Sequence, residues 1–151
     1  MLSQTGLVGR RPSPPEPDGQ AVLIRADAGR MGTGHVMRRL ALAHAWQKIG
    51  GWVAFALGAA PATVEARLAA DGVACHRITA TPGSSADAAQ TVAIARRIGA
   101  RRVVLDGYHF DVRFQRAVKA ADLALLVVDD FGHAGAYVAD LVLNQNLDAD
   151  A

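Results

Sequence analysis

The stretch AVLIRADAGRMGTGHVMRRLALAHAWQKIG, residues 21–50, decides the fold of this chain. Its first six residues, 21–26, form a short apolar run that predicts a buried β-strand. A glycine-rich loop at 29–34 follows, and residues 35–49 carry helix-forming residues with apolar positions at helical spacing. Gly50 then supplies a helix stop. The stretch therefore predicts a strand, a glycine-rich loop and a helix, in that order.

The same order of strand, loop, helix and glycine recurs along the rest of the chain. Further strands are predicted at 52–57, 73–78, 102–105 and 123–128, with a short sixth at 141–143, and further helices at 62–71, 86–98 and 111–120. Strands that are apolar throughout need cover on both faces, which is typical of a parallel sheet wrapped by helices. We therefore predict an α/β fold with a doubly wound, Rossmann-like parallel sheet.

The predicted domain covers residues 21–151, after a proline-rich tail. Four prolines fall within residues 12–17. Proline interrupts both helices and central strands, so we expect residues 1–20 to be a disordered tail.

Composition and charge limit the partners and the location. The 151 residues include 16 Lys+Arg and 14 Asp+Glu, and the arginines occur in scattered pairs with few aromatic residues between them. Nucleic-acid binding needs a contiguous basic stripe, so we expect no nucleic-acid partner. No apolar run reaches the roughly 18 residues of a membrane helix, so we expect no membrane partner. A lone Cys75 suits a reducing, cytoplasmic location.

Two familiar interpretations of the glycine-rich loop do not fit. The spacing of Gly29 and Gly34 resembles a Walker loop, but His35 and Val36 replace the lysine and the hydroxyl residue. The dinucleotide-binding pattern needs GxGxxG and an acidic residue after the second strand, whereas the glycines here are spaced GxxGxG and residues 55–58 carry no acid.

The physical properties of the loop indicate an anion site beside a base. Gly32 and Gly34 let backbone N–H groups approach an anion at a helix N-terminus, where the helix dipole favours negative charge. His35 lies at the first helical turn, and that dipole favours its neutral form, which can accept a proton. Arg38 and Arg39 follow by three and four residues, so one of them can share the face of His35.

Other polar residues follow the later strands. Asp106 and Tyr108 come after the fourth strand and can face the ligand crevice. The alternative is that this loop only initiates a helix, with Asp111 as its N-cap. Both interpretations stay open.

The segment after the fifth strand is better explained by structure than by chemistry. Asp129 and Asp130 could act as paired carboxylates, but we expect them to cap the next segment. Their proximity to His133 is thin evidence for a metal site, and we predict none. Asn144 and Asn146 are expected to satisfy backbone groups. The remaining histidines are expected at surface or packing positions: His44, His76 and His109.

The motifs around the glycine-rich loop resemble a known enzyme family. Residues 27–38, DAGRMGTGHVMR, are similar to the N-terminal signature of the nucleotide-sugar hydrolases of pseudaminic acid biosynthesis, the PseG family, which related spore-coat polysaccharide proteins share. The resemblance continues through LDGYHFD at 105–111, VDDFGH at 128–133 and ADLVLNQN at 139–146. Mild departures are Phe131-Gly-His133, where Leu-Ala is more usual, and the added proline-rich tail.

The resemblance implies a function and a set of roles. The reaction is hydrolysis of a UDP-linked diacetamido-trideoxy sugar at the anomeric carbon, with no metal and no cofactor. His35 matches the proposed base that activates water. The implied substrate-binding residues are Asp27, Gly32, Thr33, Gly34, Arg38, Asp106 and Tyr108.

The resemblance also implies a larger architecture. The family has a glycosyltransferase-B fold of two domains, and this chain matches the N-terminal one. We therefore expect the second, nucleotide-binding domain to be a missing partner, with a UDP-sugar as substrate. Two alternatives stay open: a glycosyltransferase of the same fold, in which another acceptor replaces water, and a non-catalytic nucleotide-sugar-binding fragment.

Overall fold

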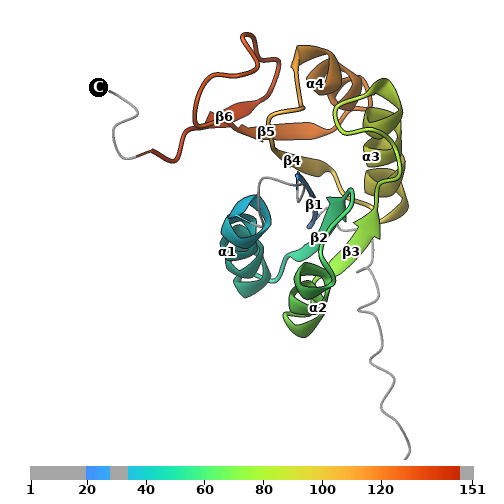
Figure 1. The fold of residues 1–151 in the computed structure, drawn as a ribbon, viewed down its shortest axis with the longest axis vertical. Helices are drawn as coiled ribbons and strands as arrows, with labels where there is room; N and C mark the ends of the chain where they lie inside the picture. The colour runs from blue at the N-terminus through green and yellow to red at the C-terminus, as the bar shows by residue number, and fades with distance from the viewer. Residues whose placement is uncertain (1–19, 28–33, 147–151) are drawn as a thin grey trace, which may run out of the picture.

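The computed structural model describes residues 20–27 and 34–146, which form a six-stranded parallel sheet with four helices against it (Figure 1). The strands are β1 (Ala21–Ala26), β2 (Trp52–Leu57), β3 (Ala74–Arg77), β4 (Arg102–Asp106), β5 (Ala124–Val128) and β6 (Leu141–Leu143). The helices are α1 (Gly34–Lys48), α2 (Ala62–Ala70), α3 (Ser85–Arg97) and α4 (Val112–Lys119). The α/β prediction is confirmed, with each predicted strand and helix present and its ends within two residues.

The strand order makes the sheet Rossmann-like. The strands lie in the order β3-β2-β1-β4-β5-β6, and every neighbouring pair is parallel. The order reverses between β1 and β4, where Ala26 pairs with Asp106. Ligands of such sheets bind outside the carboxyl ends of the strands at this point.

The helices cover both faces of the sheet, as the unbroken apolar strands require. Figure 1 shows α1 and α2 on one face and α3 and α4 on the other. All six residues of β1 are buried, and its apolar residues alternate between two apolar clusters. Val22 and Ile24 join the cluster under α1 and α2, while Leu23 joins the cluster under α3 and α4. This two-sided burial is why β1 reads as a continuous apolar run.

Local signals fix the ends of the helices. Ser84 caps α3 by accepting a hydrogen bond from the N–H of Asp87 at 3.1 Å. Asp111 caps α4 by accepting from the N–H groups of Arg113 and Phe114, both at 3.0 Å. The N–H of Phe114 contributes most to lowering the pKa of Asp111. Asp111 is therefore an N-cap, as one of the two interpretations of this loop proposed.

Two expectations fall largely outside the described residues. These are the disordered tail at 1–20, of which only Gln20 is described, and the anion site at the glycine-rich loop, of which Gly34 is described while the predicted substrate-binding residues Gly32 and Thr33 lie outside the described ranges. Within the described ranges, every helix is too short or too polar to cross a membrane.

Candidate functional site

The site forms at the carboxyl edge of the sheet, where α1 begins beside the last residue of β4. His35 is the second residue of α1, and Asp106 ends β4. The His35 Nδ1 lies 2.8 Å from Asp106 Oδ1. The Asp106 side chain is 4% exposed and the His35 side chain 16%. The structure therefore brings the predicted base and a predicted strand-end acid into direct contact.

Arg39 holds the other oxygen of the same carboxylate. Its Nε lies 2.8 Å from Asp106 Oδ2, and its side chain is 2% exposed. Residues four apart share a helix face, so His35 and Arg39 both reach Asp106 from α1. Burial lowers the pKa of Arg39, and the charge of Asp106 opposes that effect. Of the two arginines that could share the face of His35, the structure selects Arg39.

Arg38, a predicted substrate-binding residue, points elsewhere. Its side chain is half exposed, and its nearest acidic atom is Asp130 Oδ2 at 3.7 Å. A solvated guanidinium at this distance contributes little to stability and stays accessible to an anionic ligand. Its role in substrate binding stays a prediction.

The geometry gives Asp106 a different position from the one expected for a substrate contact. Its two oxygens are both engaged by α1, and it is buried. A carboxylate only accepts hydrogen bonds, so His35 donates through Nδ1–H and its Nε2 is the acceptor when the ring is neutral. This arrangement favours Asp106 as the residue that orients His35, while contact with substrate stays a prediction.

Tyr108 lies on the outer side of His35. The two rings meet edge to face, with centroids 5.4 Å apart and planes at 84°. Tyr108 also contacts His133 at 5.5 Å and Phe131 at 6.4 Å between centroids. Tyr108 is 46% exposed and Phe131 is 74% exposed. We call Tyr108 and Phe131 the aromatic platform.

Asp129 fixes the loop that carries Phe131. It accepts hydrogen bonds from the N–H groups of Phe131 at 2.9 Å and Gly132 at 2.8 Å, and from the hydroxyl of Tyr137. Burial opposes ionisation of Asp129, but these hydrogen bonds, that of Tyr137 first, hold its pKa well below the ordinary value. Burial and the Asp129 carboxylate raise the pKa of Tyr137 to about 12. The expected capping role of Asp129 is confirmed.

The same loop is not arranged as a metal centre. His133 Nδ1 lies 2.7 Å from Asp129 Oδ2, but no three His, Cys, Asp or Glu side chains are grouped for a metal ion anywhere in residues 20–27 and 34–146.

Asp130 contacts the segment after β6. It accepts a hydrogen bond from the N–H of Gln145 at 3.2 Å, and its backbone carbonyl accepts from Asn146 Nδ2 at 3.0 Å. Asn146 therefore does satisfy a backbone group, as expected.

Asp27 and the turn after β4 lie against each other. The Asp27 N–H donates to the carbonyl of Asp106 at 3.0 Å, and Asp27 Oδ2 lies 3.0 Å from His109 Nε2. Gly107 makes this approach possible, since a Cβ there would lie 2.9 Å from the Asp27 Cβ and 3.0 Å from the Phe110 ring. His109, expected at a surface or packing position, is a half-exposed partner of Asp27.

A buried ion pair beneath the site was missed by sequence reasoning. Arg25 Nε and Nη2 donate to the two oxygens of Asp87 at 2.9 and 2.8 Å, and both side chains are almost fully buried. The guanidinium also lies 5.0 Å from the centre of the Phe110 ring. The available signal was a single charged residue inside the apolar run of β1.

A second missed contact joins α1 to the segment after β6. Arg39 Nη2 donates to Oε1 of Gln145. The path His35, Asp106, Arg39 and Gln145 therefore connects the candidate base to the chain that leaves the sheet.

An apolar groove lies apart from this site. This groove of about 220 Å³ lies under α1, over β1, β4 and β5, and its lining is almost wholly apolar. Trp46 and Leu126 line it, with Arg102 and Asp140 also present. It contains neither His35 nor Asp106, so we place the chemistry at the carboxyl edge.

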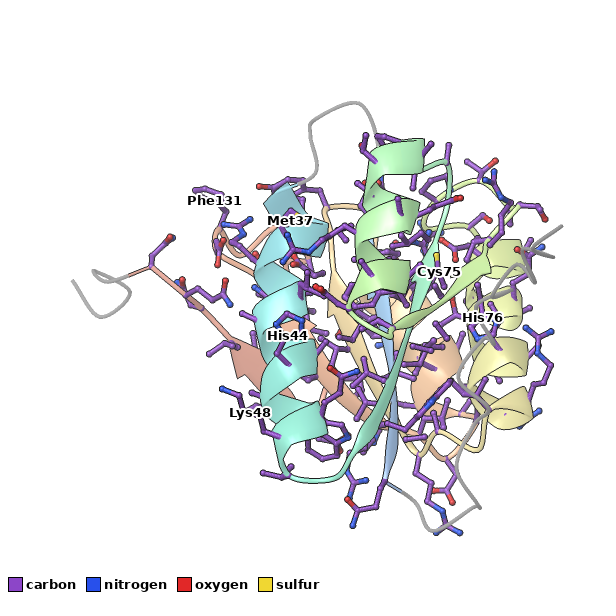
Figure 2. All side chains as sticks on the ribbon, turned by 90° about the horizontal axis from the view of Figure 1, so that it is seen from below. Met37, His44, Lys48, Cys75, His76 and Phe131 are labelled. Carbon is purple, nitrogen blue, oxygen red and sulfur yellow. The ribbon has the colours of Figure 1, made fainter. Side chains whose placement is uncertain are left out.

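Figure 2 shows the end of the molecule at which the site lies, with Phe131 and Met37 labelled there and Lys48 toward the opposite end of α1. Comparisons of this chain with family models, curated proteins and solved structures found no match.

Proposed function

We propose that this chain is the first domain of a glycosyltransferase-B-type enzyme. The reaction is hydrolysis of a UDP-linked 2,4-diacetamido-2,4,6-trideoxy sugar at the anomeric carbon, releasing UDP and the free sugar during cytoplasmic biosynthesis of pseudaminic acid. The observation that supports it most is the contact between His35 and the buried Asp106 at the sheet's switch point. The motif resemblance at residues 27–38 supplies the substrate class.

In the proposed step, His35 is the general base. Asp106 holds Nδ1–H, which leaves the lone pair on Nε2 for the proton of a water molecule. The oxygen of that water bonds to the anomeric carbon while the bond from this carbon to the UDP oxygen breaks. The bonding pair leaves with UDP, and the proton stays on His35. A positioned base of this kind contributes roughly 10²- to 10⁴-fold to rate.

The leaving group carries negative charge, and the start of α1 can receive it. The described part of the first turn has no acidic residue, so the helix dipole there is not offset by a nearby carboxylate on that turn. Gly34 has open space where a side chain would stand. Backbone N–H groups at such a position bind phosphate. We propose that Gly32, Thr33 and Gly34 face the diphosphate, with Asp27, Arg38 and Tyr108 around the sugar.

The experiment is an assay of UDP release from the UDP-linked sugar. The chain is tested alone and joined after residue 146 to the nucleotide-binding domain of a longer relative of the proposed family. His35→Asn is compared with His44→Asn, a matched control on the same helix whose Nε2 contacts Asp71 rather than Asp106.

We expect His35→Asn to lose at least 10²-fold in kcat and His44→Asn to retain the parent rate. Equal rates for His35→Asn and the parent would overturn the proposed base. Transfer of the sugar to an added alcohol in preference to water would identify a glycosyltransferase instead.

A further inference from the structure

The aromatic platform, Tyr108 and Phe131, is exposed, and its outer residue, Phe131, has no role in the proposed reaction at His35. Phe131 is 74% exposed, more than any other large apolar side chain of the described residues. A ligand that covers this ring gains the free energy of removing its apolar surface from water.

The position of Phe131 is fixed by hydrogen bonds at its own backbone. Asp129 Oδ1 accepts from the N–H groups of both Phe131 and Gly132, and Gly132 takes a φ of +69° that favours glycine. The same carboxyl group accepts from the Tyr137 hydroxyl. The backbone that carries the ring is therefore ordered before a ligand arrives, so less conformational entropy of this turn is lost on binding.

The platform continues directly from the candidate base. Tyr108 contacts His35 edge to face at 5.4 Å, and Phe131 contacts Tyr108 at 6.4 Å with planes tilted by 35°. A group seated on the platform is thus next to the imidazole. The sugar ring carries the carbon under attack, whereas the nucleobase is separated from that carbon by two phosphates and a ribose.

We propose that Tyr108 and Phe131 form a stacking subsite for the apolar face and methyl groups of the diacetamido-trideoxy sugar, with Phe131 as the specificity-determining residue. The inference rests on the proposed function for the identity of the sugar. A 6-deoxy sugar with two acetamido methyl groups presents much more apolar surface than an ordinary hexose, and aromatic faces prefer such surface.

The test uses the 151-residue chain and measures saturation transfer from protein to ligand by NMR, which suits weak binding. The probes are the free sugar, 2,4-diacetamido-2,4,6-trideoxy-L-altrose, and UDP, each added separately. Phe131→Ala removes the ring, and Phe131→Tyr keeps it. Ile49→Ala is the matched control, because Ile49 is 69% exposed just beyond the other end of α1.

We expect the parent, Phe131→Tyr and Ile49→Ala to transfer saturation to the methyl protons of the sugar. Phe131→Ala should weaken sugar binding by about 3- to 10-fold, as loss of one aromatic contact implies, and leave UDP unaffected. Unchanged sugar binding by Phe131→Ala, an equal loss in Ile49→Ala, or a loss confined to UDP would overturn the platform. Absence of sugar binding by the parent would overturn it as well.

Failure of the proposed hydrolase activity and failure of the stacking subsite give different results. If UDP release proves independent of His35 while the free sugar still binds through Phe131, the proposed function fails and the stacking subsite stands. If release needs His35 but sugar binding ignores Phe131, the subsite fails and the hydrolase stands.

Discussion

His35 and Asp106 lie 71 positions apart in the sequence, and their side chains meet with Nδ1 2.8 Å from Oδ1. The contact depends on the parallel pairing of β1 with β4, which places Asp106 beside Ala26 at the edge where α1 begins. The carboxylate then selects which nitrogen of His35 keeps its hydrogen. A positioning role for Asp106 follows, and it can be separated from a merely structural one.

Asp106→Asn should change the tautomer of His35. It also removes the charge that pairs with the buried Arg39, so urea denaturation must first show that the variant is folded. The new amide can donate to Nδ1, which would move the imidazole hydrogen to Nε2 and leave no acceptor for the proton of water. We expect kcat to fall by about 10²- to 10⁴-fold with little change in KM. The ¹⁵N chemical shifts of His35 in the chain alone report the tautomer. Unchanged shifts together with a full loss of kcat would assign Asp106 another role.

Arg39 is expected to contribute far more than Arg38 to the free energy of unfolding. Arg39→Met leaves the Asp106 charge buried without its ion-pair partner, whereas Arg38 is half exposed. Breaking a buried pair costs about 3 kcal/mol in the free energy of unfolding. Arg38→Met should change it by roughly 0.5 kcal/mol or less. Urea denaturation of the two variants at pH 7 gives the comparison, and equal losses would contradict the buried pairing.

The sequence was sufficient for the succession of strands and helices because each of these elements had a local cause. Apolar runs marked β1 and β5, and Gly50 takes the positive φ of +86° expected of a helix stop. The side-chain partners had no such signal. Whether Arg38 or Arg39 reaches Asp106 depends on the helical phase of α1. The Arg25–Asp87 pair joins residues 62 positions apart, through a strand order that no local pattern specifies.

The hydrogen bond between Tyr137 and Asp129 predicts a pH-dependent difference in stability. Tyr137→Phe should lower the free energy of unfolding by about 1–2 kcal/mol at neutral pH. The folded pKa of Tyr137, about 12, exceeds its ordinary value of about 10. The stabilisation is therefore fully present below pH 10 and is lost as pH rises from 10 to 12.

At acid pH, the titration of Asp129 gives the stabilisation by this hydrogen bond the opposite pH dependence. Its folded pKa is lowered, so the stability it supplies is present above its unfolded pKa of about 4 and is lost as pH falls below that value. The difference between the parent and Tyr137→Phe should thus be flat from pH 5 to 9 and shrink at both extremes. Denaturation at five pH values checks it, and a difference that is the same at every pH would contradict the assignment.

Cys75 is a free thiol, but it should react slowly with alkylating reagents. Burial, aided by the charge of Glu65, raises the pKa of its thiol to about 11. The thiolate is the reactive form, so at pH 8 alkylation by iodoacetamide should be on the order of 10²-fold slower than for an ordinary cysteine. The rate in urea supplies the control. A folded-state rate that matches the unfolded rate would show that the thiol is exposed.

The isolated chain is expected to lack activity. One domain supplies His35, Asp106 and the aromatic platform, but the proposed cleft needs a second domain to hold the uridine diphosphate and exclude surplus water. Positioning of reactants lowers a reaction barrier by roughly 7–11 kcal/mol, and a single domain without the facing half of the cleft loses much of this effect. We therefore expect residues 1–151 to bind the UDP-sugar weakly and to release UDP negligibly, while the joined two-domain protein turns over.

Calorimetry and UDP release on the same two proteins provide the measurement, with His35→Asn in the joined protein as the inactive control. That variant should bind substrate nearly as well as its parent, because a base acts mainly in the transition state. Robust hydrolysis by residues 1–151 alone would mean that the cleft is complete without a partner domain, and the two-domain proposal would then have to be abandoned.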